Sequence, residues 1–319
     1  MNVLHTVHWL LAALLALVAI LSVSGEEPLR RRVLNYRPTQ IFAVVSAILL
    51  APANAWATVR EVPDVGHRLI VVASIVGLVG TFAMYNMYKI RATSAAQPRR
   101  ILAIGAHPDD LELAVGGTLA RLADFGHEVH TMIMTAGAVG GDPDVRAQEA
   151  INGSKFLGVA RCDVYNFTDT DLHSDMNEMI DAIEKKISRF NPDIIFTHSS
   201  HDQHQDHSAV HLATLRAGRR HRAILCFESP SATSDFTPKV FVNIDDYVGV
   251  KSSAVAIHEN QSGKPYMTEE RVSGIAHFRG DQAKMARAEG FEAVRFSDGE
   301  RPRPSSEGTP LGSVTEQIA

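Results

Sequence analysis

The fold of this chain is decided by residues 100–119, which read RILAIGAHPDDLELAVGGTL. The apolar run from Ile101 to Gly105 is typical of a central strand in a parallel sheet. A helical pattern follows near Gly117 to Phe125. Between them lies the polar cluster His107-Pro108-Asp109-Asp110. The stretch therefore predicts a strand, a turn that carries histidine and carboxylate groups, and a helix.

The same alternation of strand and helix continues down the chain. Further strands are predicted at Glu128–Met134, Asp163–Phe167, Asp193–Thr197 and Ala223–Phe227, and helices near Val145–Leu157, Met176–Phe190 and Asp206–Ala217. This pattern predicts an α/β fold, a Rossmann-like and mostly parallel sheet with helices on both faces. Ligands of such folds bind at the carboxyl ends of the strands.

Three apolar stretches precede this domain, at roughly Val3–Val23, Ile41–Val59 and Leu69–Met87. Segments of about 20 apolar residues span the hydrocarbon core of a bilayer as helices. The second stretch contains Pro52 and Asn54, which leaves a kinked span and a re-entrant segment as alternatives. For the first stretch the alternative is a cleaved signal peptide, but its leading residues contain no Lys or Arg. We expect about three transmembrane helices.

The positive residues that flank these stretches predict their orientation. The loop after the first stretch contains Arg30, Arg31, Arg32 and Arg37. The segment after the third contains Lys89, Arg91, Arg99 and Arg100. The short second loop has only Arg60 and Arg68. The positive-inside rule then places the N-terminus outside and the α/β domain in the cytoplasm. We therefore expect a multi-pass membrane protein.

Length and composition fit this organisation. The 319 residues divide into a membrane anchor at 1–92, a linker at 93–99, a catalytic domain at 100–296 and a disordered tail at 297–319 that is rich in Pro, Ser, Gly and charge. The net charge of −5, without a basic stripe, argues against a nucleic-acid partner. Two distant cysteines exclude a disulfide framework and a zinc site built from cysteine pairs.

A second polar cluster, His204-Gln205-Asp206-His207, follows the strand that ends at Thr197. His107, Asp110 and His207 together make two imidazoles and one carboxylate, a set that leaves a coordination position open, as catalytic sites do. Zinc is the expected metal, although this donor set also accepts ferrous iron. Asp109 is adjacent to a ligand but free to act as general base. A metal-dependent hydrolase is the prediction.

Each cluster also has a simpler interpretation. The residues around Pro108 would make a turn with a negatively charged helix start, and the second run would be a solvated helix face. To replace the metal site, both simpler interpretations would have to hold at once. They would also leave unexplained why both clusters fall at strand ends, so we favour the metal site.

The sequence resembles the PIG-L/LmbE deacetylase family over roughly Arg100 to Phe296. The matching segments are Ala106-His107-Pro108-Asp109-Asp110 with Gly116-Gly117-Thr118-Leu119, the run from His198 to His207, Thr135-Ala136-Gly137 with Arg146 and Glu149, Glu228-Ser229-Pro230-Ser231, Phe236-Thr237-Pro238, His258 with Gln261, and Ala288-Glu289-Gly290-Phe291. The membrane stretches and the tail lie outside this resemblance.

The resemblance implies a role for each site residue. His107, Asp110 and His207 would be zinc ligands, and Asp109 would be the base that takes a proton from the bound water. His204 would steady the oxyanion or protonate the leaving amine, with Asp206 orienting it. Arg146 would contact the sugar or another polar group. Some members place a tyrosine just ahead of the last histidine of the second motif, where this chain has Asp202 and no tyrosine.

The resemblance also implies an N-acetylated amino-sugar conjugate as substrate. The predicted membrane anchor favours a lipid-linked N-acetylglucosamine, because tethering raises the local concentration of such a molecule. A soluble conjugate remains an alternative. Two other classes also remain: a membrane-tethered sugar-binding protein without catalysis, and a hydrolase of another amide or of a phosphoester.

Overall fold

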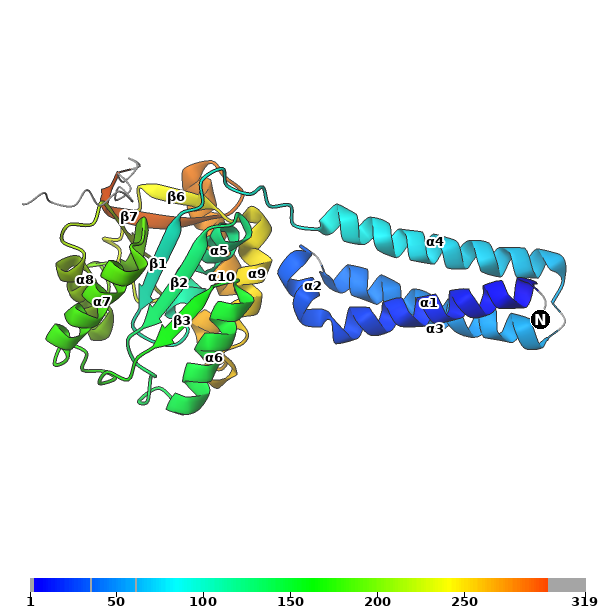
Figure 1. The fold of residues 1–319 in the computed structure, drawn as a ribbon, viewed down its shortest axis with the longest axis horizontal. Coiled ribbons are helices and arrows are strands. Elements are labelled where there is room, and N and C mark those ends of the chain that lie inside the picture. The colour runs from blue at the N-terminus through cyan, green and yellow to red at the C-terminus, as the bar shows by residue number, and fades with distance from the viewer. Residues whose placement is uncertain (1–2, 35, 61, 298–319) are drawn as a thin grey trace, which may run out of the picture.

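The structure is a computed structural model, and it describes residues 3–34, 36–60 and 62–297. An N-terminal helical bundle and a larger α/β domain lie end to end (Figure 1). The anchor contains α1 Val3–Ser24, α2 Glu26–Arg32, α3 Tyr36–Val59 and α4 Asp64–Tyr88. The α/β domain contains β1 Arg100–Gly105, α5 Asp110–Asp124, β2 Glu128–Ile133, α6 Pro143–Phe156, β3 Arg161–Val164, α7 Met176–Phe190, β4 Ile194–His198, α8 Gln205–Ala217, β5 Ala223–Phe227, β6 Val240–Asn243, η1 Asp245–Tyr247, α9 Val248–Val255, η2 Glu259–Gln261, η3 Pro265–Met267, α10 Glu269–Ala283 and β7 Ala288–Phe296.

The seven strands form one sheet in the order β3-β2-β1-β4-β5-β7-β6. The pairs among β1 to β5 are parallel, and β7 pairs antiparallel with both β5 and β6. The predicted α/β class with a mostly parallel sheet is confirmed. The strand order reverses direction at β1 and β4, the place where ligands bind in open α/β sheets.

Successive side chains of β1 point to opposite faces and enter two separate cores. Ile101 and Ala103 pack with α5, α6 and α9, whereas Leu102 and Ile104 pack with α7 and α8. All four residues have no exposed surface. Helices therefore cover both faces of the sheet, as predicted from the continuous apolar strands.

Most element predictions agree closely with the structure, and the differences have clear causes. Helix α5 begins at Asp110 instead of Gly117, because Asp109 takes the N-cap position directly after the turn. Strand β3 lies two residues earlier than predicted, in register with β2. The predictions left α2, β6, β7, α9 and α10 unassigned. Residues 298–319 of the predicted tail lie outside the described residues.

The anchor carries its large apolar residues outward and its small residues inward. Leu49, Val72 and Phe82 are 65%, 58% and 70% exposed, whereas Ala47 and Gly77 are buried between the helices. Helices that pack within lipid show this distribution. Helices α1, α3 and α4 are each long and apolar enough to cross a membrane. The second is continuous through Pro52 over 24 residues, which does not support a re-entrant segment.

A buried polar network joins the three long helices. His8 Nδ1 lies 2.7 Å from Asn54 Oδ1, and His8 Nε2 lies 2.9 Å from His67 Nδ1. Asn54 Nδ2 donates to Ser74 Oγ at 2.7 Å. Because an amide oxygen only accepts, His8 donates from Nδ1 to Asn54. The network fixes the register of the helices.

The short helix α2 docks the anchor onto the α/β domain. Arg31 donates to both carboxylate oxygens of Asp124, at 2.9 and 2.6 Å, and to the carbonyl oxygens of Phe156 and Leu157 at 2.8 and 3.2 Å. The residue that follows α2, Val33, forms an antiparallel bridge with Lys89. Both arginine-rich segments therefore lie at the end of the bundle that faces the α/β domain (Figure 1).

Candidate metal centre

The predicted site residues converge at the carboxyl ends of β1 and β4. His107, Asp109, Asp110, His204 and His207 line one cavity of about 360 Å³. Arg146, Asp169 and Tyr266 line it as well. The first cluster follows β1 directly, and the second lies at the start of α8. The sheet therefore brings together two motifs that are almost 100 residues apart, as the strand-end rule requires.

Asp110 holds the centre of this group. Its Oδ2 accepts hydrogen bonds from the backbone N–H groups of Ala106 and His107, at 3.1 and 2.7 Å. Its Oδ1 lies 3.3 Å from His207 Nε2. Burial raises the pKa of Asp110, but the imidazoles of His207 and His198 outweigh this and hold it well below its usual value. The carboxylate is thus ionised, with Oδ2 held by the backbone and Oδ1 facing His207 Nε2.

Both imidazoles in the predicted ligand set have one nitrogen bound by a carboxylate. His107 Nε2 lies 3.0 Å from Asp206 Oδ2, and His207 Nδ1 lies 2.8 Å from Asp202 Oδ2. Donation to these carboxylates leaves the lone pairs of His107 Nδ1 and His207 Nε2 on the side of Asp110. Metal-binding histidines are oriented in this way in proteins.

His198 lies against the same carboxylate but has another role. Its Nε2 is 3.3 Å from Asp110 Oδ2 and accepts a hydrogen bond from Ala106 N at 3.0 Å. Burial lowers the pKa of His198 to about 4, so the ring is neutral. Because its Nε2 lone pair is used by the backbone, His198 supports the turn that carries the ligands.

The residues fit a divalent cation. Asp110 with His107 and His207 supplies oxygen and nitrogen donors of the types that zinc and ferrous iron accept. Without a cation the imidazoles take up protons: burial lowers the pKa of His207, but Asp110 and Asp202 raise it to about 9. The carboxylates at this place also outnumber the groups with a permanent positive charge. A divalent cation would compensate this excess negative charge. Three groups at this place each have ligand atoms within 4.8 Å of one another: His107, His204 and His207; Asp110, His198 and His207; and His107, Asp169 and Asp206. They share members with the predicted set His107, Asp110 and His207, but none of them is that set.

Asp109 has the environment expected of a general base. It has φ 108°, a conformation that costs energy for a residue other than glycine and that often marks functional sites. Burial, followed by the charge of Asp110, raises the pKa of Asp109 to about 6, against the opposing effects of His258 and Arg146. A carboxyl group in this range can exchange protons near neutral pH.

Arg146 is buried behind the base. Its Nη1 donates to Gly137 O at 2.6 Å, its Nη2 donates to Pro108 O at 3.1 Å, and Nη2 lies 3.6 Å from Asp109 Oδ2. Gly137 has φ 71°, and a Cβ there would lie 2.1 Å from Arg146 Nη1. The arginine therefore fixes the turn and the Gly137 loop, in addition to lining the cavity where we predicted a substrate contact.

His204 and Asp206 do not interact as predicted. The Asp206 carboxylate accepts from His107 Nε2 and from the N–H groups of Thr170 and Leu172, at 3.0, 2.8 and 3.1 Å. His204 Nδ1 instead accepts the backbone N–H of Asp206 at 3.2 Å, as the N-cap of α8. The prediction that the Asp206 carboxylate orients His204 is therefore wrong, because helix capping performs that task. In this arrangement Nε2 carries the proton of the neutral His204 ring.

Two acidic residues were missed as parts of the site. Asp169 Oδ1 lies 3.3 Å from His107 Nε2, and Asp169 Oδ2 accepts from Val139 N at 2.6 Å. The hydrogen bond from His107 is the main reason that the pKa of Asp169 is lowered to about 2. Its place in the loop after β3 was the available signal. Asp202 accepts from His207 and from Ser231 Oγ at 2.6 Å.

The comparisons with known proteins agree with this fold and site. The family profile described as "PIG-L: GlcNAc-PI de-N-acetylase" matches residues 102–218. The "Uncharacterized deacetylase YaiS" of Escherichia coli (strain K12) is 40% identical over 175 residues, which are 53% of this chain and 95% of that protein. The "Diacetylchitobiose deacetylase" of Thermococcus kodakarensis is 28% identical, over 61% of this chain and 83% of that protein.

A solved structure shows how widely the fold is used. GalB, the 4-carboxy-2-hydroxymuconate hydratase of Pseudomonas putida KT2440, superposes with a TM-score of 0.56 at 20% identity, over 64% of this chain and all of that one. The fold and the histidine–aspartate centre define a Rossmann-like α/β protein with a candidate catalytic metal site. The chain belongs to the PIG-L family, whose relatives named above include deacetylases.

Proposed function

We propose that this protein is a membrane-anchored, metal-dependent deacetylase that removes the acetyl group from an N-acetylglucosamine-type sugar. One observation carries the proposal. Two imidazoles, each held by its own carboxylate, turn their free nitrogens toward Asp110, while the buried Asp109 lies beside them in the same cavity. The relative named diacetylchitobiose deacetylase supports an N-acetylated sugar as the substrate class.

The residues divide the hydrolysis among them. A divalent cation bound by His107, Asp110 and His207 would acidify a water molecule and polarise the acetyl carbonyl. Asp109 accepts a proton from the attacking water. Asp109 then passes this proton to the nitrogen that leaves, so that acetate and a free amine are the products. The neutral His204 ring donates a hydrogen bond from Nε2 to the tetrahedral oxyanion. The carboxylates of Asp202 and Asp206 keep the two ligand imidazoles in place, and Arg146 is positioned to contact a sugar hydroxyl from the cavity wall.

The anchor supports a location at a membrane. The three long helices and the basic residues at their α/β end support crossing the membrane three times, with the N-terminus outside and the catalytic domain in the cytoplasm. The proposed division is an anchor at 1–92, a linker at 93–99 and a catalytic domain at 100–296. A lipid-linked amino sugar is the favoured substrate, because tethering concentrates enzyme and substrate on one surface.

The test is acetate release from a panel of soluble and lipid-linked N-acetylglucosamine conjugates, with zinc or ferrous iron restored. Asp109→Asn is the matched variant, since it keeps size and polarity but cannot accept the proton. We expect its rate to fall by about 10³-fold with substrate binding and metal content retained. Binding without release by the wild type would instead indicate a sugar-binding protein, and turnover of soluble conjugates alone would contradict the lipid-linked substrate.

A further inference from the structure

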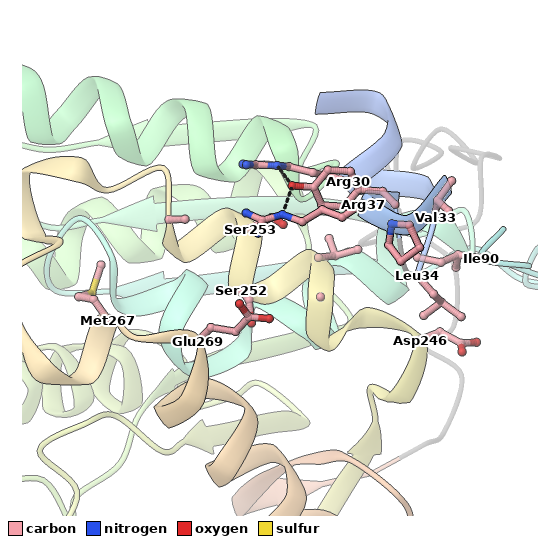
Figure 2. A pocket seen from close by; sticks show the side chains of 15 residues that line it. Arg30, Val33, Leu34, Arg37, Ile90, Asp246, Ser252, Ser253, Met267 and Glu269 are labelled. Atoms are coloured by element: carbon pink, nitrogen blue, oxygen red, sulfur yellow. Dashed lines mark hydrogen bonds between the residues drawn. The ribbon is translucent and has the colours of Figure 1, made fainter. Parts of the chain in front are cut away.

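A second cavity lies where the anchor meets the catalytic domain, away from the metal centre. This junction cavity has a volume of about 410 Å³ and lies between the α2–α3 turn and helices α9 and α10 (Figure 2). Its lining includes Arg30, Tyr36 and Arg37 from the anchor and Asp246 and Glu269 from the catalytic domain. It is large enough for a small polar molecule or a lipid headgroup.

The wall on the anchor side is cationic and lies at the depth of lipid phosphates. Tyr36 and Arg37 begin α3, and Ile90 on the same cavity follows α4 by two residues. The ends of spans lie among the headgroups, where tyrosine and arginine are favoured. The Nε groups of Arg30 and Arg37 both donate to Tyr36 Oη at 3.1 Å, so one hydroxyl gathers two guanidinium groups. Glu26 offsets one of these charges, 2.9 Å from Arg30 Nη2.

The opposite wall is anionic and belongs to the cytoplasmic domain. Asp246 lies in η1 and Glu269 is the first residue of α10. Within residues 3–34, 36–60 and 62–297 neither carboxylate lies within 4.0 Å of a basic nitrogen, although the charge of Glu269 acts on Arg37. In Figure 2 Glu269 lies beside Ser252 and Asp246 lies apart from it, both below Arg30 and Arg37 in the view, whereas Ser253 lies close to the arginines. The cavity is thus positive toward the bundle and negative toward the cytoplasm.

This order of charges matches one kind of lipid headgroup. In phosphatidylethanolamine the phosphate lies next to the glycerol and the primary ammonium lies farther from the hydrocarbon. We infer that the junction cavity binds the phosphoethanolamine headgroup, with its phosphate at Arg30 and Arg37 and its ammonium at Asp246 and Glu269. Guanidinium groups bind phosphate in a bidentate manner, and carboxylates accept the N–H groups of a primary ammonium. An anionic headgroup without an amine leaves both carboxylates unpaired.

This inference uses the proposed membrane anchoring but not the deacetylase activity. In a bilayer, the lipid would bridge α3 and α10 beside the docked helix α2. The apolar residues Val33, Leu34 and Ile90 also line the cavity and suit the glycerol end of the lipid.

Binding is tested with the full-length protein, delipidated in detergent. Dihexanoyl phosphatidylethanolamine, phosphatidylglycerol and phosphatidylcholine are each titrated, and binding is followed by the thermal unfolding temperature and by native mass spectrometry. We expect phosphatidylethanolamine to bind about tenfold more tightly than the other two, the difference of a charge-assisted contact. Equal affinity for all three lipids, or no binding, overturns the inference.

Two variants separate the ends of the headgroup. Arg37→Gln should weaken all three lipids, because they share the phosphate, whereas Glu269→Gln should weaken only phosphatidylethanolamine, by about tenfold. Glu270→Gln is the matched control, since Glu270 is the exposed neighbour on α10 and does not line the cavity. Equal effects of the two glutamate variants also overturn the inference. The short-chain lipids are added in solution, so this binding test does not require the protein to lie in a membrane. A protein that fails to fractionate with membranes therefore contradicts the proposed anchoring and not the binding of the headgroup.

Discussion

Arg31 and Asp124 form a two-pronged ion pair across 93 residues of sequence, with Nη1–Oδ2 and Nη2–Oδ1 distances of 2.9 and 2.6 Å. Planar pairing of this kind fixes direction as well as distance. Since Arg31 also donates to backbone carbonyls of the α/β domain, this side chain helps to fix how the helical bundle meets that domain.

Replacing Arg31 should release the catalytic domain from the anchor without unfolding it. Arg31→Met removes a mostly buried pair that contributes about 2 kcal/mol to docking. We expect faster proteolysis between residues 89 and 99 and unchanged metal content. Arg32→Met is the control, because Arg32 does not contact Asp124. Equal cleavage of both variants would show that Arg31 does not hold the junction.

The carboxylates behind the ligand imidazoles should control metal affinity. Asp202→Asn and Asp206→Asn each remove an acceptor that fixes the tautomer of His207 or of His107. Each change should weaken zinc binding by about 10- to 100-fold. The measurement is competition with a chelator of known affinity. Asp171→Asn, an exposed change in the same loop as Asp169, is the control. An Asp206 variant with unchanged zinc affinity would show that the Asp206 carboxylate does not fix the tautomer of His107.

The rate should depend on pH through Asp109. Asp109 acts as a base only when ionised, so the rate falls as the pH drops through its pKa, which is about 6 in the metal-free protein. A cation beside it lowers this pKa, so the acid limb should lie at or below about pH 6. His204 is neutral and donates a hydrogen bond from Nε2, so His204→Gln should lower kcat/KM and keep the acid limb of its profile against pH. Loss of the acid limb in that variant would show that His204 is the base.

A buried ion pair behind the base should reveal itself in a double-mutant cycle. Glu112 Oε2 and His258 Nε2 are 3.4 Å apart and both side chains are fully buried. Burial lowers the pKa of His258, but the carboxylates of Glu112 and then Asp109 raise it above its usual value overall, which favours the charged imidazole. Glu112→Gln or His258→Gln alone leaves one buried charge without a partner and should cost about 3 kcal/mol. The double variant should cost much less than the sum, measured by thermal unfolding with saturating zinc. Additive losses would contradict the pairing.

Much of the fold and the centre of the site follow from sequence alone. The positions of His107, Asp110 and His207 were predictable, because polar residues after apolar strands fall at one edge of a parallel sheet. The partner of Asp206 was not predictable, since its spacing from His204 and from His107 says nothing of which imidazole its carboxylate reaches. Asp169 was missed because its loop has no motif, and only the fold brings it to His107.

The C-terminal third of the domain shows another limit of sequence patterns. Strand β7 follows α10 along the chain, yet it pairs antiparallel between β5 and β6, and no local pattern records that return. Helix α2 was missed because its seven residues are polar apart from Leu29 and Pro28, and its packing depends on the distant Asp124. In each case a partner far along the chain decides the structure.

Strands β1, β2 and β3 run across the long axis of the helical bundle, so the edge of the sheet that carries the metal centre faces sideways (Figure 1). If the bundle stands upright in a bilayer, this edge of the sheet lies beside the bundle axis, at a height above the surface set by the contact at Arg31. A substrate attached to lipid would then meet the enzyme by sliding in the plane of the membrane. Its rate of turnover would follow the number of substrate molecules per unit area, and dilution of the surrounding cytoplasm would leave it unchanged.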